Sequence, residues 1–251
     1  MSNNKAEMTF WDHLEVLRWV ILRVGIALVV AFCVCFAFMP KMFDKIITAP
    51  TKGDFFMYKA LGGLFDGDFN VDLININVTA PFFTHMSTSL WVAVILIFPY
   101  VLWEIWRFVA PALYPSEKKG VRSTFVGAGG LFYLGCALGY FVIFPITFRF
   151  LAGYHIGEGI LTQISLNSYI STFLSIIFVM GLVFELPILA YLLSSLGILH
   201  KPILKQYRRY AIVILLILAA LITPTGDPFT LGVVFLPIYL LYEVSILIVK
   251  P

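Results

Sequence analysis

This sequence contains few charged residues. Only 12% of its 251 residues are Asp, Glu, Lys or Arg, whereas 61% are hydrophobic, and the mean hydropathy is +0.95. Soluble domains are about 25% charged, so this chain has too little polar surface to cover so large an apolar content in water. We therefore predict a multi-pass membrane protein in which residues 1–251 form a single membrane domain.

Cysteine and histidine are scarce as well. The cysteines (Cys33, Cys35 and Cys136) lie in apolar runs and lack the paired spacing of a metal site. The four histidines fall outside the predicted spans, which disfavours an intramembrane serine or zinc protease. Nucleotide-binding glycine loops and the common hydrolase motifs are missing too. We predict a protein that is not an enzyme, that needs no cofactor or metal, and that does not bind nucleic acid.

One acidic stretch matches a calcium-binding loop only in part. Its alternating polar residues are Asp66, Asp68, Asn70 and Asp72. An EF-hand loop also needs glycine at its sixth position and glutamate at its twelfth, where this chain has Val71 and Asn77. A solvated turn is the better interpretation of this stretch.

Long apolar runs are what the sequence does have. A helix needs about 20 apolar residues to cross the hydrocarbon core of a membrane. The runs predict an all-α protein with six transmembrane helices at approximately residues 19–39, 88–110, 123–148, 168–196, 210–222 and 229–249. The fifth run is only about 20 Å long as a helix, less than the ~30 Å core, so we expect the last two runs to form a short hairpin.

The first 18 residues predict an amphipathic helix at the membrane surface. Phe10, Leu14 and Leu17 recur at helical spacing, with Trp11 beside them and charged residues between. The first span should follow this helix. We expect Pro40 to end that span, because proline lacks the N–H group that a helix interior uses.

Lysine and arginine are unevenly shared between the two predicted sides. If the N-terminus is cytoplasmic, six spans place twelve of these cations inside and five outside, as the positive-inside rule requires. The outer set is Lys41, Lys45, Lys52, Lys59 and Arg149. We therefore predict that both termini are cytoplasmic.

Glu185 is the most conspicuous acid within the predicted spans. An unpaired carboxylate at the centre of a membrane helix costs about 2.5–3.5 kcal/mol, which favours a functional role such as a partner contact or a proton relay. Pro187 makes this region more polar still, because it frees a backbone carbonyl one turn earlier. The alternative is a structural hydrogen bond to a neighbouring helix. For Glu243, in the last span, a structural role and a functional role are equally compatible with the sequence.

The polar stretch between the second and third spans is unusual for a simple turn. It runs from Phe108 to Lys119 and contains Pro111, Pro115 and Glu117. Asp12 and Glu15, three residues apart, can share one helix face at the same membrane surface. Together these acids suit a cationic ligand, and arginine above all, because a guanidinium binds carboxylates through paired hydrogen bonds. Alternatively, Glu117 only pairs with its neighbours Lys118, Lys119 or Arg122.

Five motifs in this order resemble the TatC family, the multispanning receptor subunits of the twin-arginine protein translocase. The resemblance covers essentially the whole chain. The motifs are His13-Leu-Glu-Val-Leu-Arg18, Phe108-Val-Ala-Pro-Ala-Leu-Tyr114 followed by Glu117, Phe184-Glu-Leu-Pro187, Thr223-Pro-Thr-Gly-Asp227 and Tyr242-Glu243.

The resemblance implies a function and a set of residues. A protein of this family binds folded precursors through a signal peptide with paired arginines, recruits single-span TatA-like and TatB-like partners, and depends on the proton-motive force. It implies a homo-oligomer within a larger complex in the bacterial inner membrane. The residues implied to bind the signal peptide are Glu15, Glu117, Phe108, Asp12 and Arg18. The implied intramembrane polar site consists of Glu185 and Pro187. The residues implied to have a structural role in the outer loops are Pro50, Phe82, Phe83 and Asp227.

This chain departs from the family pattern at one position. The family places its N-terminal glutamate two residues before the arginine, where this chain has Val16, and Glu15 stands one position earlier. Such a shift turns a helical side chain by about 100°. Signal binding could then use Glu15 from a rotated helix, use Asp12, or depend more on Glu117. The competing function is a proton-coupled secondary transporter of a small solute that uses Glu185.

Overall fold

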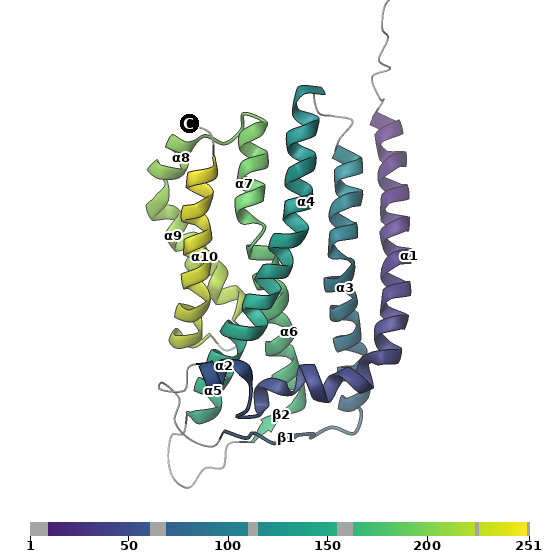
Figure 1. The fold of residues 1–251 in the computed structure, drawn as a ribbon, viewed down its shortest axis with the longest axis vertical. Coiled ribbons are helices and arrows are strands. Elements are labelled where there is room, and N and C mark those ends of the chain that lie inside the picture. Colours follow the sequence, from purple (N-terminus) through teal and green to yellow (C-terminus); the bar gives the residue numbers. More distant parts are fainter. Residues whose placement is uncertain (1–9, 61–68, 110–114, 155–162, 224–225, 250–251) are drawn as a thin grey trace, which may run out of the picture.

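The long helices lie side by side as a bundle with roughly parallel axes (Figure 1). The computed structural model describes residues 10–60, 69–109, 115–154, 163–223 and 226–249, and the side chains of Phe10, Asp12, His13, Val109, Val126 and residues 115–123 lie outside this description. The long elements are α1 (Phe10–Met42), α3 (Ala80–Val109), α4 (Pro115–Leu138), α6 (Leu166–Val183), α7 (Leu186–Ser195), α9 (Arg208–Ile222) and α10 (Pro228–Ile248). The prediction of an all-α membrane protein is confirmed.

Shorter elements connect the long ones. They are η1 (Phe43–Ile47), η2 (Ala49–Thr51), α2 (Phe56–Ala60), η4 (Gly139–Ile143), α5 (Phe144–Gly153) and α8 (Lys201–Gln206). The sequence did not predict β1 (Leu73–Ile74), which pairs in parallel with β2 (Ile164–Ser165). This pair joins two segments at the end of the bundle opposite the start of α1 (Figure 1).

Among the residues that the structure describes, five helical segments are long and apolar enough to cross a membrane. They are Leu14–Thr51, Ala80–Phe108, Gly127–Gly153, Leu166–Ser195 and Pro228–Ile248. The fifth predicted span coincides with α9, whose 15 residues make about 22 Å of helix, less than a ~30 Å core. The number of six spans therefore stays a prediction, although α9 and α10 do pack together as a hairpin.

The first helix is longer than the sequence predicted. We expected a separate surface helix before the first span, but α1 runs unbroken from Phe10 to Met42. Pro40 lies inside α1 and does not end it. Proline leaves the carbonyl four residues earlier without its helical donor. That carbonyl belongs to Phe36, and it contacts His85 Nε2 at 3.0 Å, so the lost helical bond is replaced.

His85 was also expected to lie outside the spans, but it lies within α3, in a segment apolar enough to cross a membrane. Its ring stacks on Phe36, with ring centroids 4.0 Å apart. The polar imidazole is therefore accommodated by one hydrogen-bonding contact and one aromatic contact, both with α1. The two helices pack along each other, at one side of the bundle (Figure 1).

Glycines bring α4 and α6 into close contact. A Cβ atom added to Gly135 would lie 2.6 Å from the carbonyl oxygen of Met180, and one added to Gly139 would lie 3.1 Å from Cα of Ile177. This is the close backbone approach that small residues four apart allow in membrane helices. The core surrounds this contact and includes the fully buried Phe132 and Met180.

Three tyrosine hydroxyl groups hold the segment after α1 against the bundle. Tyr140 donates to the carbonyl of Ile46 (2.9 Å) and Tyr169 to that of Ile47 (2.6 Å). Tyr58, which lies in the segment itself, donates to the carbonyl of Pro50 (2.8 Å) and also approaches that of Pro145 in α5 (3.3 Å). Burial raises the pKa of the Tyr58 phenol, and the charge of Arg149 offsets this only in part. The Tyr58 hydroxyl therefore keeps its proton and its role as donor at neutral pH.

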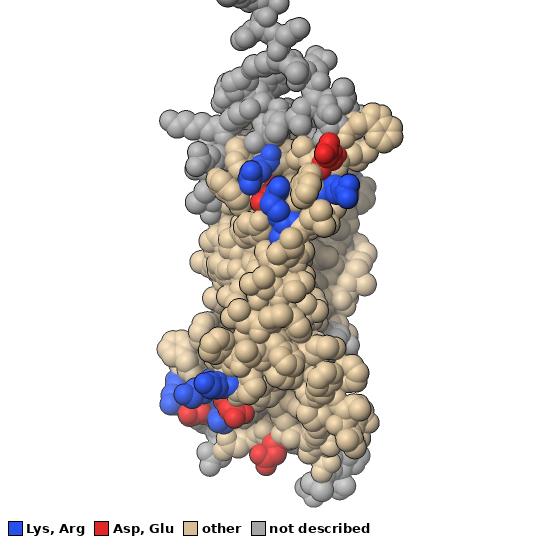
Figure 2. Space-filling view, turned by 90° about the vertical axis from the view of Figure 1, so that its right-hand side faces the viewer, with Lys and Arg blue, Asp and Glu red and all other residues tan. Residues whose placement is uncertain are grey.

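Charged side chains gather at the two ends of the molecule. On the face seen in Figure 2, acidic and basic residues occupy the upper and lower parts, and an uncharged belt separates them. Helix α1 begins at the same end of the bundle at which α10 ends (Figure 1). An uncharged belt between two charged ends is the surface expected of a protein that crosses a membrane.

Candidate functional site

An apolar cavity of about 440 Å³ lies between α3, α4 and the paired helices α6 and α7. Its lining is apolar apart from Glu185 and Ser195. The apolar residues around it are Phe98, Leu102, Ile105, Phe125, Ala128, Leu182, Ile188, Leu189, Leu192, Leu193 and Leu196. A second cavity of about 390 Å³ lies between α4, α7 and α10, and Pro187 is part of its wall.

Glu185 stands where the fourth span is interrupted. Helix α6 ends at Val183 and α7 begins at Leu186, with Pro187 in its first turn, where the missing N–H costs no helical bond. The backbone of Glu185 is satisfied, because its N–H donates to Leu182 and its carbonyl accepts from Leu189. The carboxyl group is not: its Oε1 is buried and has no hydrogen-bond partner among the described residues.

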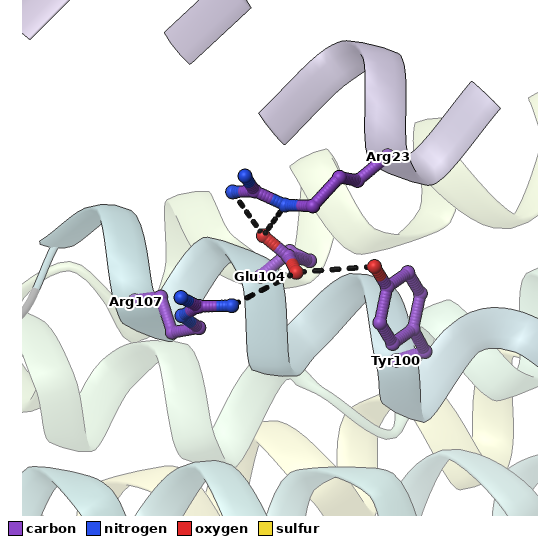
Figure 3. A network of polar contacts seen from close by, with 4 residues as sticks. All are labelled: Arg23, Tyr100, Glu104 and Arg107. Carbon is purple, nitrogen blue, oxygen red and sulfur yellow. Dashed lines mark hydrogen bonds and ion pairs between the residues drawn. The ribbon is translucent and has the colours of Figure 1, made fainter. Parts of the chain in front are cut away.

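A second acid, Glu104, lies in α3 and is fully paired. Its side chain is only 1% exposed. Arg23 of α1 donates to Oε2 from Nε at 3.0 Å and from Nη2 at 2.8 Å. Tyr100 donates to Oε1 at 3.1 Å, and Arg107 approaches the same oxygen at 3.5 Å. Figure 3 shows the side chains of Arg23, Tyr100 and Arg107 converging on this carboxylate.

This network was not predicted from the sequence, because neither Arg23 nor Glu104 was among the residues singled out in the sequence analysis. The sequence feature that could have indicated the pair is the position of Arg23 and Glu104 near the same end of two successive antiparallel spans. Charged residues in membrane helices usually pair with one another. The contact itself links residues 81 positions apart and became visible only in the fold.

Glu243, whose role the sequence left open, is also paired within the chain. Arg208 donates to its Oε2 at 2.7 Å, and Tyr239 donates to its Oε1 at 2.8 Å. Glu104, Glu185 and Glu243 are acids of the described apolar helices. Of these three, only Glu185 has a buried carboxyl oxygen without a hydrogen-bond partner among the described residues. This difference singles out Glu185 as the acid available to another molecule.

The residues predicted to bind a signal peptide lie at the end of the bundle where α1 begins. Glu15 and Arg18 are exposed on α1, and Phe108 is half-buried near the end of α3. The side chains of Asp12 and Glu117 lie outside the described part of the chain, so how these acids are arranged stays a prediction. Glu117 was expected in a loop, but its backbone belongs to the first turn of α4, which begins at Pro115.

The predicted outer-loop residues are structural neighbours of helix starts and turns. Pro50 is buried in η2 and accepts the hydrogen bond from Tyr58. Phe82 and Phe83 begin α3 as a pair of exposed rings with centroids 5.7 Å apart. Asp227 caps α10, because its Oδ1 accepts from the N–H of Thr230 at 2.7 Å.

Within the described residues, no group of three or more His, Cys, Asp or Glu side chains is placed to hold a metal ion. Asp66 and Asp68, which belong to the partial calcium-loop pattern, lie outside those residues.

A bundle of long apolar helices with charge at its ends defines a multi-pass, all-helical membrane protein. The chain belongs to the TatC family: the model of the family "Sec-independent protein translocase protein (TatC)" matches residues 12–237. A TatC protein of Blattabacterium sp. subsp. Periplaneta americana is 35% identical over 259 residues, covering 99% of this chain and 97% of that protein. A TatC protein of Aquifex aeolicus is 32% identical and covers 97% of this chain and 95% of its own length.

Solved structures agree with this assignment. A crystal structure of a twin arginine translocase receptor, TatC, superimposes with a TM-score of 0.76 at 32% identity and covers 94% of this chain and 97% of its own. A second, of the same receptor in DDM, gives a TM-score of 0.78 at 32% identity and covers 95% of this chain and 100% of its own. The protein is thus a translocase component and not an enzyme.

Proposed function

We propose that this protein recognises twin-arginine signal peptides of folded precursor proteins and recruits TatA-like and TatB-like single-span partners for export that depends on the proton-motive force. It acts in the bacterial inner membrane with both termini in the cytoplasm, as a homo-oligomer within a larger complex. Residues 1–251 act as one membrane domain with six spans.

The cavity that Glu185 faces carries this proposal. Its apolar lining suits the side chains of a membrane helix, and its one buried carboxyl oxygen without a partner suits a single polar group on that helix. A buried polar atom that finds a partner avoids a cost of about 1–3 kcal/mol. Docking of a partner helix, or of the apolar part of a signal peptide, is therefore favoured at this place.

Recognition of the paired arginines falls to the acids at the end where α1 begins. A guanidinium binds a carboxylate through charge-assisted hydrogen bonds, which strengthen when water is partly excluded at a membrane surface. Glu15, Asp12 and Glu117 supply the carboxylates, and Phe108 supplies an apolar contact beside them. Arg18 completes the surface from α1.

The experiment that tests recognition is photocrosslinking from positions 15, 16 and 117 to a precursor whose signal carries either Arg-Arg or Lys-Lys. We expect crosslinks that require Arg-Arg, with the yields at 15 and 16 reporting which side of α1 faces the signal. Glu117→Gln should abolish export while the protein still inserts, because it removes the charge and keeps the shape. Unchanged export by Glu117→Gln would contradict the proposal.

A proton-coupled solute transporter, the competing function, is not favoured. The chain belongs to a family of protein translocase subunits over nearly its full length. A transporter that uses Glu185 would also need no protein partner at the cavity, and reconstitution without partners would then give solute uptake.

A further inference from the structure

The chain contains a carboxylate that already binds arginine. Glu104 lies one helical turn before Phe108 on α3, and its side chain is almost completely buried. Two guanidinium groups and one phenol surround its two oxygens (Figure 3). A carboxylate offers about four acceptor positions. Guanidinium groups, the donors that a twin-arginine signal presents, make three of the four contacts here.

The two arginines are held unequally. Arg23 places two nitrogens on Oε2 at 2.8 and 3.0 Å, close to the 2.7–2.9 Å range of strong charge-assisted bonds. Arg107 reaches Oε1 at 3.5 Å, and its side chain is 57% exposed. The strongest pairing is one in which a guanidinium binds both oxygens of a carboxylate. Neither arginine does so in these contacts. The position of Arg107 is therefore the one that a second guanidinium can take most easily.

An exchange of one arginine for another avoids the main cost of opening a buried ion pair. Removing a partner from a buried charge is strongly destabilising, because the remaining charge is left uncompensated. If an incoming guanidinium replaces that of Arg107, Arg23 stays in place and the carboxylate remains neutralised throughout. The side chain of Arg107 then moves into solvent, where it is already more than half exposed.

We propose that Glu104 is a further arginine-binding residue of the receptor surface. An arginine of the signal peptide displaces Arg107 from Oε1, while Arg23 remains on Oε2 and positions the carboxylate. Arg107 thus keeps Glu104 paired when no signal is bound. This inference rests on the proposed function, because it assigns one more residue to the same recognition step.

The test measures binding of a fluorescent signal peptide to the detergent-solubilised full-length protein by anisotropy, at one fixed salt concentration. The peptide is used in an Arg-Arg form and a Lys-Lys form. The variants are Arg107→Gln, Glu104→Gln and the double variant. Arg209→Gln is the matched control, since Arg209 is an exposed cation whose guanidinium lies over Tyr210.

We expect Arg107→Gln to tighten binding of the Arg-Arg peptide about two- to fivefold, because the peptide no longer has to displace an exposed ion pair of that strength. Glu104→Gln should weaken it about tenfold, since it removes a hydrogen bond to a charged group. In the double variant the gain from Arg107→Gln should disappear. The Lys-Lys peptide should show no comparable gain, because its ammonium lacks the planar fork, and Arg209→Gln should change nothing.

The outcomes separate the two proposals. A wild-type protein that binds both peptides equally overturns the proposed function. A wild-type preference for Arg-Arg, with no gain in Arg107→Gln or with a gain that persists in the double variant, overturns only the role of Glu104. If Glu104→Gln does not purify as a single species, the role of Glu104 is still tested by comparing how Arg107→Gln changes the binding of the Arg-Arg and the Lys-Lys peptide. An equal gain for Lys-Lys would then mean a general charge effect and would overturn the inference.

Discussion

Among individual residues, Glu185 differs from the paired acids Glu104 and Glu243 because part of its carboxyl group has no partner in the described chain. We predict that Glu185→Ala weakens association with a single-span partner more than it weakens signal binding. The physical reason is that the mutation removes the one carboxyl group lining a cavity that is apolar apart from Glu185 and Ser195. Crosslinking yields to partner and to precursor, measured on the same membranes, give the comparison.

The control for Glu185 is Ser195→Ala, which changes the other polar residue of the same cavity and should affect partner crosslinking less. Loss of signal crosslinks with intact partner crosslinks in Glu185→Ala would reverse the expected order and contradict the assignment.

Asp227 has a local role that can be measured separately. Its carboxylate accepts from the N–H of Thr230 and caps α10. Replacement of such a cap by alanine costs about 0.5–2 kcal/mol. We expect Asp227→Ala to lower the free energy of unfolding by that amount in a denaturant titration, whereas Asp227→Ser, which retains a capping oxygen, should stay close to wild type. Equal losses in both variants would assign the effect to something other than the cap.

Among the helices, the α4–α6 contact depends on the absence of side chains. Gly135 lies so close to Met180 and Phe184 that a methyl group would force the two helices apart. We predict that Gly135→Ala lowers the free energy of unfolding by about 1–3 kcal/mol, the usual cost of overpacking. The measurement is unfolding in a mixed-detergent titration.

Gly127 provides the control on the same helix. A Cβ atom there would meet nothing within 4 Å, so Gly127→Ala should be neutral or stabilise by up to about 1 kcal/mol. If both alanine variants lose the same stability, the close contact at Gly135 does not explain the loss.

Helix boundaries were less predictable than helix identity. The predicted spans overlap the long described helices. Apolar length did not show that α1 continues through Pro40, that α4 starts at Pro115 or that the predicted span at 168–196 is divided into α6 and α7. The continuation through Pro40 depends on His85, a residue of another helix, which satisfies the carbonyl that proline leaves free. A rule based on the local sequence has no access to that partner.

For the whole molecule, the predicted six crossings with both termini in the cytoplasm give a topology that can be tested. Val78 is almost fully exposed at the end of the bundle opposite the start of α1, and Ile203 lies in α8 at the other end (Figure 1). We predict that a cysteine at position 78 reacts with a membrane-impermeant thiol reagent from outside intact cells, and that a cysteine at 203 reacts only after lysis. The predicted topology places most of the positive residues on the cytoplasmic side, as the positive-inside rule requires.

A cysteine at position 229, at the start of α10, tests the short hairpin in the same assay. Reaction from outside would establish that α9 and α10 both cross the membrane despite the length of α9. Reaction only after lysis at positions 78 and 229 would contradict the predicted orientation. The three native cysteines should be replaced beforehand, because Cys33 is exposed.

The sequence by itself determined the class of the protein, its helices and the acids most open to function. Low charge and long apolar runs leave a membrane as the only suitable solvent, and an acid such as Glu185 stands out in an apolar run whatever surrounds it. Only the tertiary structure decided which acids have partners. The pairing of Arg23 with Glu104, and the unpaired oxygen of Glu185, depend on how α1, α3, α4 and α7 pack. That packing arises from contacts between residues far apart in the chain, which no local pattern records.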